Sequence, residues 1–141
     1  MSAPALPPRL AELVEEFQDV GPSDRLQLLL ELSQELPELP PHVTRDSMQR
    51  VPECQSPLLL AVEVDNDQRV HLYFDAPPEA PTTRGLAAVL HTGLDGELVP
   101  TVLGTPDDFY LHLGLAEAVS PLRLRGGAAM LARIKRTVCQ A

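Results

Sequence analysis

A β-hairpin is predicted by the stretch Leu58–Phe74, which reads LLLAVEVDNDQRVHLYF. Its first half, Leu58–Val64, is almost continuously apolar and favours a strand. In its second half, apolar side chains alternate with more polar ones over Val70–Phe74, as in a strand with one buried face. Asn66–Asp67 lies between the halves and is typical of a turn. A further short strand is expected around Met48–Val51.

Two helical patterns precede the hairpin. The first has apolar residues at positions i, i+3, i+4 and i+7 from Leu10 to Phe17, and Gly21 ends it. The second begins after Ser23, the expected N-cap, and runs to about Leu36. Because the connection between them is short, we expect the two helices to form an antiparallel pair.

Helical patterns return after the hairpin. An apolar stripe over Leu86–Leu94 is ended by Gly96, and a short helix is expected near Asp107–Leu113. A C-terminal helix is expected to enter through Ser120–Pro121 and to carry the apolar stripe Met130–Val138. Proline clusters lie between these patterns, as expected where helices and strands end.

The order of these patterns predicts an α+β fold with a small antiparallel sheet of about three strands and helices packed on one face. Strands and helices do not alternate, which argues against a Rossmann-like fold. The length of 141 residues suits one domain spanning residues 1–141, with residues 1–8 expected to be flexible.

Composition narrows the possible partners. The net charge is −9, and all of it lies in residues 1–75, which carry 14 acidic and 5 basic side chains. An acidic surface repels phosphate backbones, and aromatic residues make up only 4%, so we expect no nucleic-acid partner.

The sequence also bears on where the protein is found. No apolar run approaches the roughly 20 residues of a membrane span, and Met1–Pro8 does not read as a secretory signal. Two widely separated cysteines suit a reducing compartment, so a cytoplasmic location is expected.

The sequence lacks the spacings of metal sites and of common hydrolases. The four histidines show no H-x₃₋₅-H spacing, and neither C-x-x-C nor H-E-x-x-H occurs. G-x-S-x-G and a glycine-rich phosphate loop are also absent from the sequence. We therefore expect neither a bound metal nor a hydrolytic active site of these kinds.

Cys54 lies in an unusual segment, between Pro52 and Pro57. These prolines are expected to keep the intervening residues out of helix and out of regular strand pairing, which leaves a short, stiff loop with Cys54 near its tip. A thiolate held there can be presented to the active site of another protein, as sulfur exchange requires. The alternative is that Cys54 packs as a small buried apolar residue. Cys139, near the end of the chain, is interpreted as an incidental thiol.

The neighbours of Cys54 leave its thiol chemistry open. Glu53 is expected to raise the pKa of the thiol, whereas Arg45, Arg50 or an arginine folded over from elsewhere in the chain would lower it. Gln55 and Ser56 have groups that donate hydrogen bonds to a thiolate or a persulfide, and the same groups can equally cap the loop.

The C-terminal stretch is basic. Arg133, Lys135 and Arg136 lie near the end of the predicted helix, where positive charge offsets the helix dipole. Arg123 and Arg125 lie near its start, where positive charge is unfavourable, so a salt bridge to the acidic half or a partner contact is expected.

Five blocks of the sequence carry a family resemblance. Leu32–Leu39 looks like the end of a second helix in that family, and Glu53–Ser56 matches its Gly-Cys-Gln-Ser loop. Arg84–Val89 looks like a Lys/Arg-Gly-Leu helix start. Ser120–Arg123 and Gly127–Met130 are similar to its Ser/Thr-Pro-x-Arg and Gly-Leu-x-Ala-Met stretches. Over roughly residues 9–137 the chain resembles the SufE sulfur-acceptor proteins of iron–sulfur cluster biogenesis.

The resemblance implies a fold like that of the scaffold IscU and a function in sulfur transfer. Cys54 would take sulfane sulfur from a SufS-type cysteine desulfurase, become a persulfide, and pass the sulfur to a downstream Fe–S scaffold complex. Pyridoxal phosphate belongs to the desulfurase, so this chain would be an activator without a cofactor rather than an enzyme. Arg123 is implied to support the Cys54 loop or the desulfurase contact, with Arg84 second. A monomer or a weak dimer is expected.

The chain departs from the family pattern beside the cysteine. Glu53 replaces the usual glycine, and Pro57 and Leu59 replace a Gln and a Trp. Two other functions are considered. A scaffold that assembles a cluster or binds zinc needs about three cysteine-type ligands, which this chain lacks unless it dimerises. A non-catalytic interaction module would simply pack Cys54.

Overall fold

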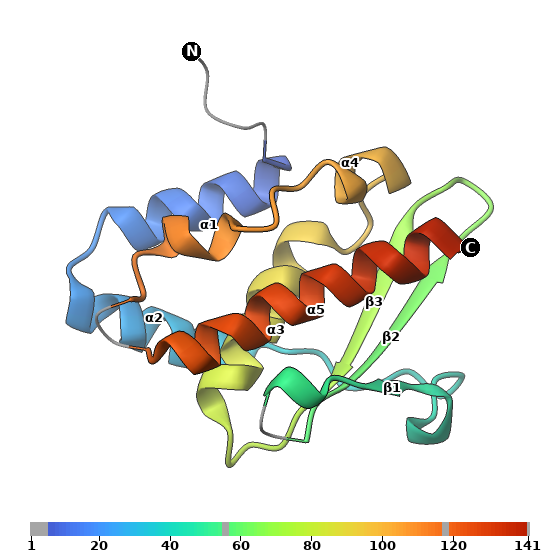
Figure 1. The fold of residues 1–141 in the computed structure, drawn as a ribbon, viewed down its shortest axis with the longest axis horizontal. Helices are drawn as coiled ribbons and strands as arrows, with labels where there is room; N and C mark the ends of the chain where they lie inside the picture. Colours follow the sequence, from blue (N-terminus) through green and yellow to red (C-terminus); the bar gives the residue numbers. More distant parts are fainter. Residues whose placement is uncertain (1–5, 55–56, 117–118, 141) are drawn as a thin grey trace.

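The computed structural model describes residues 6–54, 57–116 and 119–140. Five α-helices lie on one side of a three-stranded antiparallel sheet in this part of the chain (Figure 1). The α-helices are α1 (Pro8–Gln18), α2 (Pro22–Gln34), α3 (Pro81–Leu94), α4 (Val99–Leu103) and α5 (Pro121–Gln140). Three 3₁₀ helices are η1 (Arg45–Ser47), η2 (Pro52–Cys54) and η3 (Phe109–Leu113). The predicted α+β fold is confirmed.

The sheet has the order β1 (Gln49–Arg50), β2 (Leu59–Val64) and β3 (Val70–Asp75). The predicted hairpin is confirmed, because β2 and β3 pair along their whole length. The carboxylate of Asp65 accepts backbone hydrogen bonds within the connecting turn, which fixes the return of the chain. The short strand expected around residues 48–51 is confirmed as β1, which pairs with the start of β2.

Prolines mark where the helices begin. α1, α2, α3 and α5 each start on a proline, since the first helical position needs no backbone N–H donor and favours the fixed proline φ. For this reason the expected N-cap at Ser23 is wrong: Gly21 caps α2 and Pro22 is its first residue. The pattern at 107–113 forms η3 rather than an α-helix, and α4 was not predicted.

Helix α3 lies at the centre of the helical layer, where α1 and α2 both pack on it (Figure 1). Two of its glycines allow close approach, because an added Cβ would lie 2.7 Å from Leu29 at Gly85 and 2.9 Å from Leu10 at Gly93. Contact between α1 and α2 themselves is slight. The predicted antiparallel pair is therefore wrong in its packing: each helix covers α3 instead of its neighbour.

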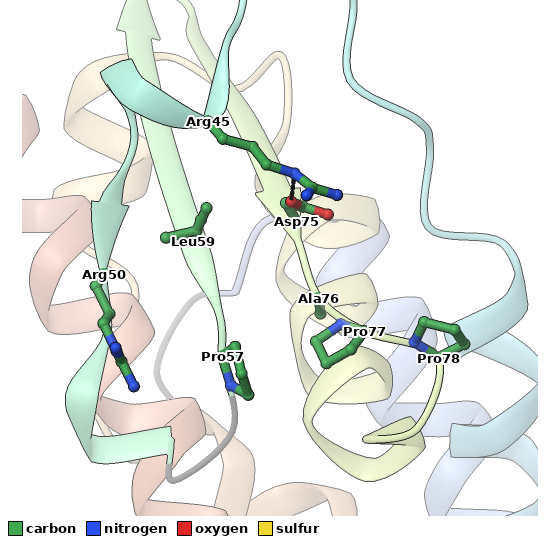
Figure 2. Close-up of a pocket in the computed structure, with 8 residues that line it drawn as sticks. All are labelled: Arg45, Arg50, Pro57, Leu59, Asp75, Ala76, Pro77 and Pro78. Carbon is green, nitrogen blue, oxygen red and sulfur yellow. Dashed lines mark ion pairs between the residues drawn. The ribbon is translucent and has the colours of Figure 1, made fainter.

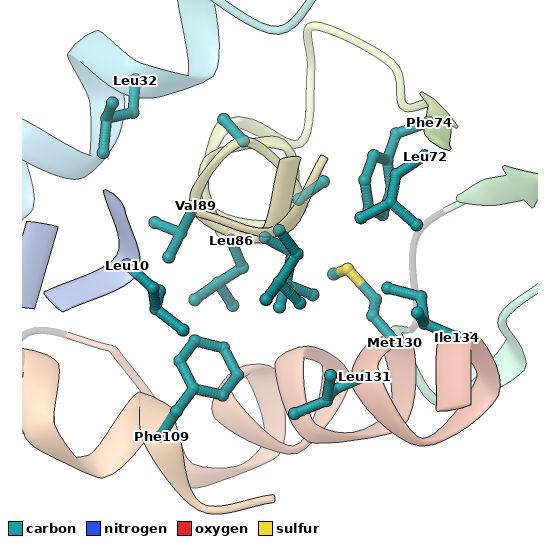
Figure 3. Packing of buried hydrophobic residues seen from close by; sticks show 14 of the residues in the cluster. Leu10, Leu32, Leu72, Phe74, Leu86, Val89, Phe109, Met130, Leu131 and Ile134 are labelled. Carbon is teal, nitrogen blue, oxygen red and sulfur yellow. The ribbon is translucent and has the colours of Figure 1, made fainter. Parts of the chain in front are cut away.

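One face of the sheet packs on the helices. Leu60 from β2 and Val70, Leu72 and Phe74 from β3 are buried on it, and α3 and α5 cover them. Figure 3 shows α3 nearly end-on, with apolar side chains from the sheet, α1, α2, η3 and α5 around it. These side chains form one cluster, so the sheet and the helices share a hydrophobic core.

The N-terminal segment joins the fold earlier than expected. Residues 1–5, part of the segment expected to be flexible, lie outside the described residues. Leu6 packs against the core, Pro7 is buried and Pro8 begins α1, so these three belong to the fold.

Candidate functional site

Cys54 ends η2, the single 3₁₀ turn that connects β1 to β2. Its backbone N–H donates to the carbonyl of Val51 over 3.2 Å, and the N–H of Val51 donates to the carbonyl of Leu58 over 3.0 Å. The turn is thus anchored at the base where β1 and β2 meet. The prediction that Pro52 excludes helix is wrong for one turn, which starts on that proline because an N-terminal position needs no N–H. Gln55 and Ser56 lie outside the described residues.

The side chain of Cys54 is buried rather than displayed at a loop tip, with 3% of its surface exposed. Its thiol donates a weak hydrogen bond to the carbonyl oxygen of Gly126 in α5, with the sulfur 3.7 Å from that oxygen. A Cβ at Gly126 would lie 3.2 Å from Sγ and 3.3 Å from Cα of Cys54, so the helix comes this close because residue 126 has no side chain. The expected exposed thiol is therefore not present in this conformation.

Burial and charge both suppress ionisation of this thiol. Loss of solvent, together with the smaller effect of the Glu53 carboxylate, raises the pKa of Cys54 to about 11, and Arg133 acts in the opposite direction. The expected effect of Glu53 is confirmed in direction. The pKa of Glu53 itself is lowered, by a hydrogen bond from its own backbone and by the positive charge of Arg133. In this conformation Cys54 is a neutral thiol at physiological pH.

Arg133 is the residue at this site that the sequence pattern did not single out. Its Nη2 lies 3.3 Å from Oε1 of Glu53, which joins α5 to the turn next to Cys54. Its Nε is buried and has no acceptor within the described ranges. Arg133 and Lys135, both expected to offset the helix dipole, make ion pairs: Arg133 with Glu53, and Lys135 with Asp107, whose Oδ1 lies 2.7 Å from Nζ. The only features of the sequence that could have predicted this ion pair are the positive charges of the C-terminal helix and the acidic residue next to Cys54.

Arg84 makes contacts typical of a structural residue. Its Nε donates to the carbonyl of Ser33 over 2.8 Å, and its Nη1 donates to the carbonyl of Ala76 over 2.7 Å. Both acceptors belong to buried residues, so Arg84 links the end of α2 and the segment after β3 to α3. A functional role for Arg84 stays a prediction.

Arg123 lies exposed in the first turn of α5. Its backbone N–H donates to the side-chain oxygen of Ser120 over 3.3 Å, which places Ser120 at the start of the helix as expected. Its side chain makes no ion pair with the residues that the structure describes. Residues three apart on a helix share a side, so Arg123 lies one turn before Gly126, on the side that receives Cys54.

A pocket of about 350 Å³ lies beside the Cys54 turn (Figure 2). Pro57, the first described residue after the turn, lies in the middle of the lining, with Arg50 of β1 on one side and Pro77 and Pro78 on the other. At its upper end Arg45 reaches across to Asp75, with Nε 2.6 Å from the carboxylate. This hollow therefore has apolar walls and arginines at its rim.

The described residues offer no place for a metal ion. No three histidine, cysteine, aspartate or glutamate side chains gather there at ligating distances. Three of the four histidines each face a separate carboxylate: His42 faces Glu63, His71 faces Asp65 and His91 faces Asp95.

None of the α-helices within residues 6–54, 57–116 and 119–140 combines the length and the apolar character needed to cross a membrane.

These features define a small α+β domain that holds one buried thiol in a proline-flanked turn against a glycine of its last helix. Comparison with known proteins identifies the family. The model of the SufE family, described as an Fe-S metabolism associated domain, matches residues 11–138. This chain therefore belongs to the SufE family, whose role lies in Fe–S metabolism.

The relatives match nearly all of this chain or the whole of it. A SufE-like protein of Mycobacterium tuberculosis is 55% identical over 142 residues, covering 100% of this chain and 99% of that protein. A chloroplastic/mitochondrial SufE-like protein of Arabidopsis thaliana is 34% identical over 128 residues, which are 89% of this chain and 33% of the plant protein. A solution structure of a protein from Thermus thermophilus matches with a TM-score of 0.85 at 40% identity, covering 97% of this chain and 98% of that one.

Proposed function

We propose that this protein accepts sulfane sulfur on Cys54 from a cysteine desulfurase and passes it on to Fe–S cluster assembly. Family membership supports the general role in Fe–S metabolism. The observation that supports the specific step is the position of Cys54 at the end of a single 3₁₀ turn between β1 and β2, outside the residues that pair β2 with β3.

The transfer reaction is an exchange between sulfurs. A desulfurase cysteine carries a persulfide, and the thiolate of Cys54 attacks the outer sulfur of that group. The sulfur–sulfur bond of the donor breaks, the donor cysteine leaves as a thiolate, and a persulfide forms on Cys54. The proton lost by Cys54 balances the one gained by the donor, and no external oxidant or reductant is needed. Pyridoxal phosphate would remain in the desulfurase, and this chain would need no cofactor of its own.

The buried state sets a condition on this reaction. A neutral thiol with 3% exposure is neither accessible nor nucleophilic, so Cys54 must leave its seat on α5 before it reacts. The pocket beside the turn is open to solvent close to the place where Cys54 would emerge, and Arg45 and Arg50 lie at its rim (Figure 2). We propose that the desulfurase approaches from this side.

The deciding experiment is mass spectrometry of the protein after incubation with a desulfurase and cysteine. We expect the peptide that contains Cys54 to gain one sulfur atom, and the Cys54→Ser variant to lose this product and the stimulation of the desulfurase. The matched control is Cys139→Ser, which removes the other thiol and leaves both readouts unchanged. If sulfur appears on Cys139 alone, or if Cys54→Ser stimulates as well as the parent, the proposal is wrong.

One observation favours a second candidate, a non-catalytic interaction module. Cys54 is part of the hydrophobic core cluster, as a purely structural cysteine would be. In that case Cys54→Ala lowers the melting temperature but leaves desulfurase stimulation intact in the folded protein.

A further inference from the structure

The two edges of the sheet differ in how their backbone groups are paired. On the β3 edge, the N–H of Val70 donates to the carbonyl of Glu97 over 2.8 Å, and the carbonyl of Val70 accepts from Gly96 over 2.7 Å. The next outward N–H on this strand, that of Leu72, donates to the carboxylate of Asp95 over 2.8 Å. The segment that follows α3 therefore caps the start of β3, which is one of the ways in which proteins protect a sheet edge.

The β2 edge is covered only where β1 pairs with it, up to Leu60. Opposite Val62 and Val64 lie the two β3 residues whose N–H groups point away from β2, to the capped edge. In antiparallel strands the two residues of a pair exchange either both hydrogen bonds or none, so Val62 and Val64 direct their backbone groups to the uncovered side. Within the described residues, none of the backbone hydrogen bonds reaches them there.

A groove follows this uncovered side between β2 and the end of α5. One part, of about 260 Å³, is lined by Val62, Glu63 and Thr137 among others. The next part, of about 500 Å³, is lined by Val64 and Val138 and by residues of the hairpin turn. Figure 1 shows the C-terminal end of α5 beside the hairpin, and α5 contacts β2. Space for an extended chain therefore adjoins backbone groups that can pair with it.

We propose that this groove, named here the open β2 edge, binds an extended segment of a partner protein as an added strand. The segment continues the line of β1, so it runs antiparallel to β2 and pairs its backbone with Val62 and Val64. Strand addition gains affinity from main-chain hydrogen bonds and specificity from alternate side chains. The open β2 edge lies at the hairpin end of β2, whereas the Cys54 turn precedes the start of that strand. This inference goes beyond sulfur acceptance and does not depend on it.

The two faces beside the open β2 edge call for alternating side chains. Residues of β2 with even numbers lie on the helix side of the sheet, as the burial of Leu60 shows. A segment residue opposite Val62 or Val64 therefore projects toward α5, where Val138 is apolar. The segment residues on either side of it project to the outer face of the sheet, next to Glu63.

The outer face beside the groove is acidic. Glu63 is 46% exposed, and a hydrogen bond from His42 holds the pKa of its carboxyl below the usual value. A hydrogen bond from His71 likewise lowers the pKa of Asp65 at the hairpin end. Both carboxylates are therefore ionised at neutral pH, and no lysine or arginine lines the groove in the described part of the chain. A matching segment carries apolar side chains that alternate with basic ones.

A second copy of this chain fits the open β2 edge poorly. Pairing Val62 of one copy with Val64 of the other uses both free residues, and this register places the two Glu63 side chains opposite each other. Like charges directly opposite each other on paired strands are destabilising. A basic segment has no such repulsion, so the charge of the edge favours a partner over self-association.

The test uses a short, acetylated and amidated peptide that alternates lysine and valine, titrated into the full-length ¹⁵N-labelled protein. Hydrogen exchange of single backbone amides is followed by NMR. In the free protein the amides of Val62 and Val64 should exchange fast, whereas those of Ala61 and Glu63, which face β3, should be protected. We expect a Kd of about 0.1–1 mM. Peptide at about ten times the Kd should slow exchange at Val62 and Val64 about tenfold.

Two modified peptides separate strand addition from simple charge attraction. In antiparallel pairing the valines lie opposite Val62 and Val64, so their N–H groups face β2 and those of the lysines face away. N-methylation of every valine should abolish binding, and N-methylation of every lysine should leave the Kd unchanged. Glu63→Gln should weaken binding about two- to fivefold. Its matched control is Glu38→Gln, which removes an exposed carboxylate beside the β3 edge and should not change the Kd.

Three outcomes would overturn the proposal. One is slow exchange at Val62 and Val64 in the free protein, because the edge would then already be covered. Another is an equal loss of binding with both methylated peptides, which would assign the attraction to charge alone. The third is protection of these amides that rises with protein concentration in the absence of peptide, since a second copy would then occupy the edge. Sulfur uptake by Cys54 is a separate measurement, so the proposed function and the open β2 edge stand or fail independently.

Discussion

At one end of α5 the thiol of Cys54 packs against Gly126, whereas at the other end Cys139 lies exposed in the last turn. Exposure alone would favour Cys139 as the reactive thiol. The surroundings differ in kind: Cys54 lies on a turn joined to α5 by contacts far apart in sequence, and Cys139 belongs to the regular helix. A thiol that must carry an unstable persulfide benefits from controlled access. The contrast between the two cysteines means that, under the proposed function, the reactivity of Cys54 depends on movement of its turn away from α5.

Alkylation of the free protein tests this contrast with the largest expected effect. A thiol whose pKa is about 11 instead of 9.0 holds about a hundredfold less thiolate at neutral pH, and burial slows its reaction further. Cys139 should therefore react with iodoacetamide more than about a hundredfold faster than Cys54. Peptide mass spectrometry over time measures both rates, and denaturation in urea, as the control, should bring them close together. Similar rates in the folded protein would contradict the buried position of Cys54.

Arg84 and Arg123, the two arginines among the candidate site residues, also differ in how far the fold buries them. Arg84 is held by two buried carbonyls, whereas Arg123 is exposed. Arg84→Ala leaves both carbonyls without a donor, so we expect the free energy of unfolding to fall by about 2–3 kcal/mol. Chemical denaturation measures this loss. The control is Arg45→Ala, which removes an ion pair whose arginine is 75% exposed and should cost less than about 1 kcal/mol. A stable Arg84→Ala protein with impaired sulfur transfer would assign Arg84 to function instead.

The pH dependence of stability gives a smaller effect with a definite sign. The unfolded chain loses the proton of Cys54 near pH 9.0, while the folded chain keeps it to about 11, so raising the pH between these values favours unfolding. At pH 10 this removes about 1.4 kcal/mol of stability relative to neutral pH. Denaturant titrations of the parent and of Cys54→Ser, compared at the two pH values, isolate this contribution. An equal loss in both proteins would place its origin elsewhere.

Local sequence patterns predict most of the fold. The hairpin, the start of α5 at Pro121 and the stripe of α3 depend on periodicity and turn residues within one segment, and all three are confirmed. The packing of α1 and α2 could not be predicted, because the small residues that select it, Gly85 and Gly93, belong to a distant helix.

Local sequence patterns predict less of the candidate site than of the fold. Position and motif single out Cys54, but its burial depends on Gly126, which lies 72 residues away. The pairing of Glu53 with Arg133 spans 80 residues, and nothing local distinguishes Arg133 from the other cations of α5. Contacts of this range are formed by the tertiary fold, so a single sequence leaves them undetermined.

Arg123 provides the smallest test and the one closest to partner binding. Its side chain is exposed one turn before Gly126, so it can contact a protein that docks over the Cys54 turn without contributing to the fold. Arg123→Ala should change the free energy of unfolding by less than about 0.5 kcal/mol and slow sulfur transfer about fivefold. Arg125→Ala is the matched control, since Arg125 is also exposed but points to a different side of α5. Transfer rates are measured at limiting protein concentration, where weaker docking lowers the rate and saturation restores it. If Arg123→Ala instead unfolds at a clearly lower temperature and its folded fraction transfers sulfur at the parent rate, Arg123 stabilises the start of α5 and the docking surface lies elsewhere.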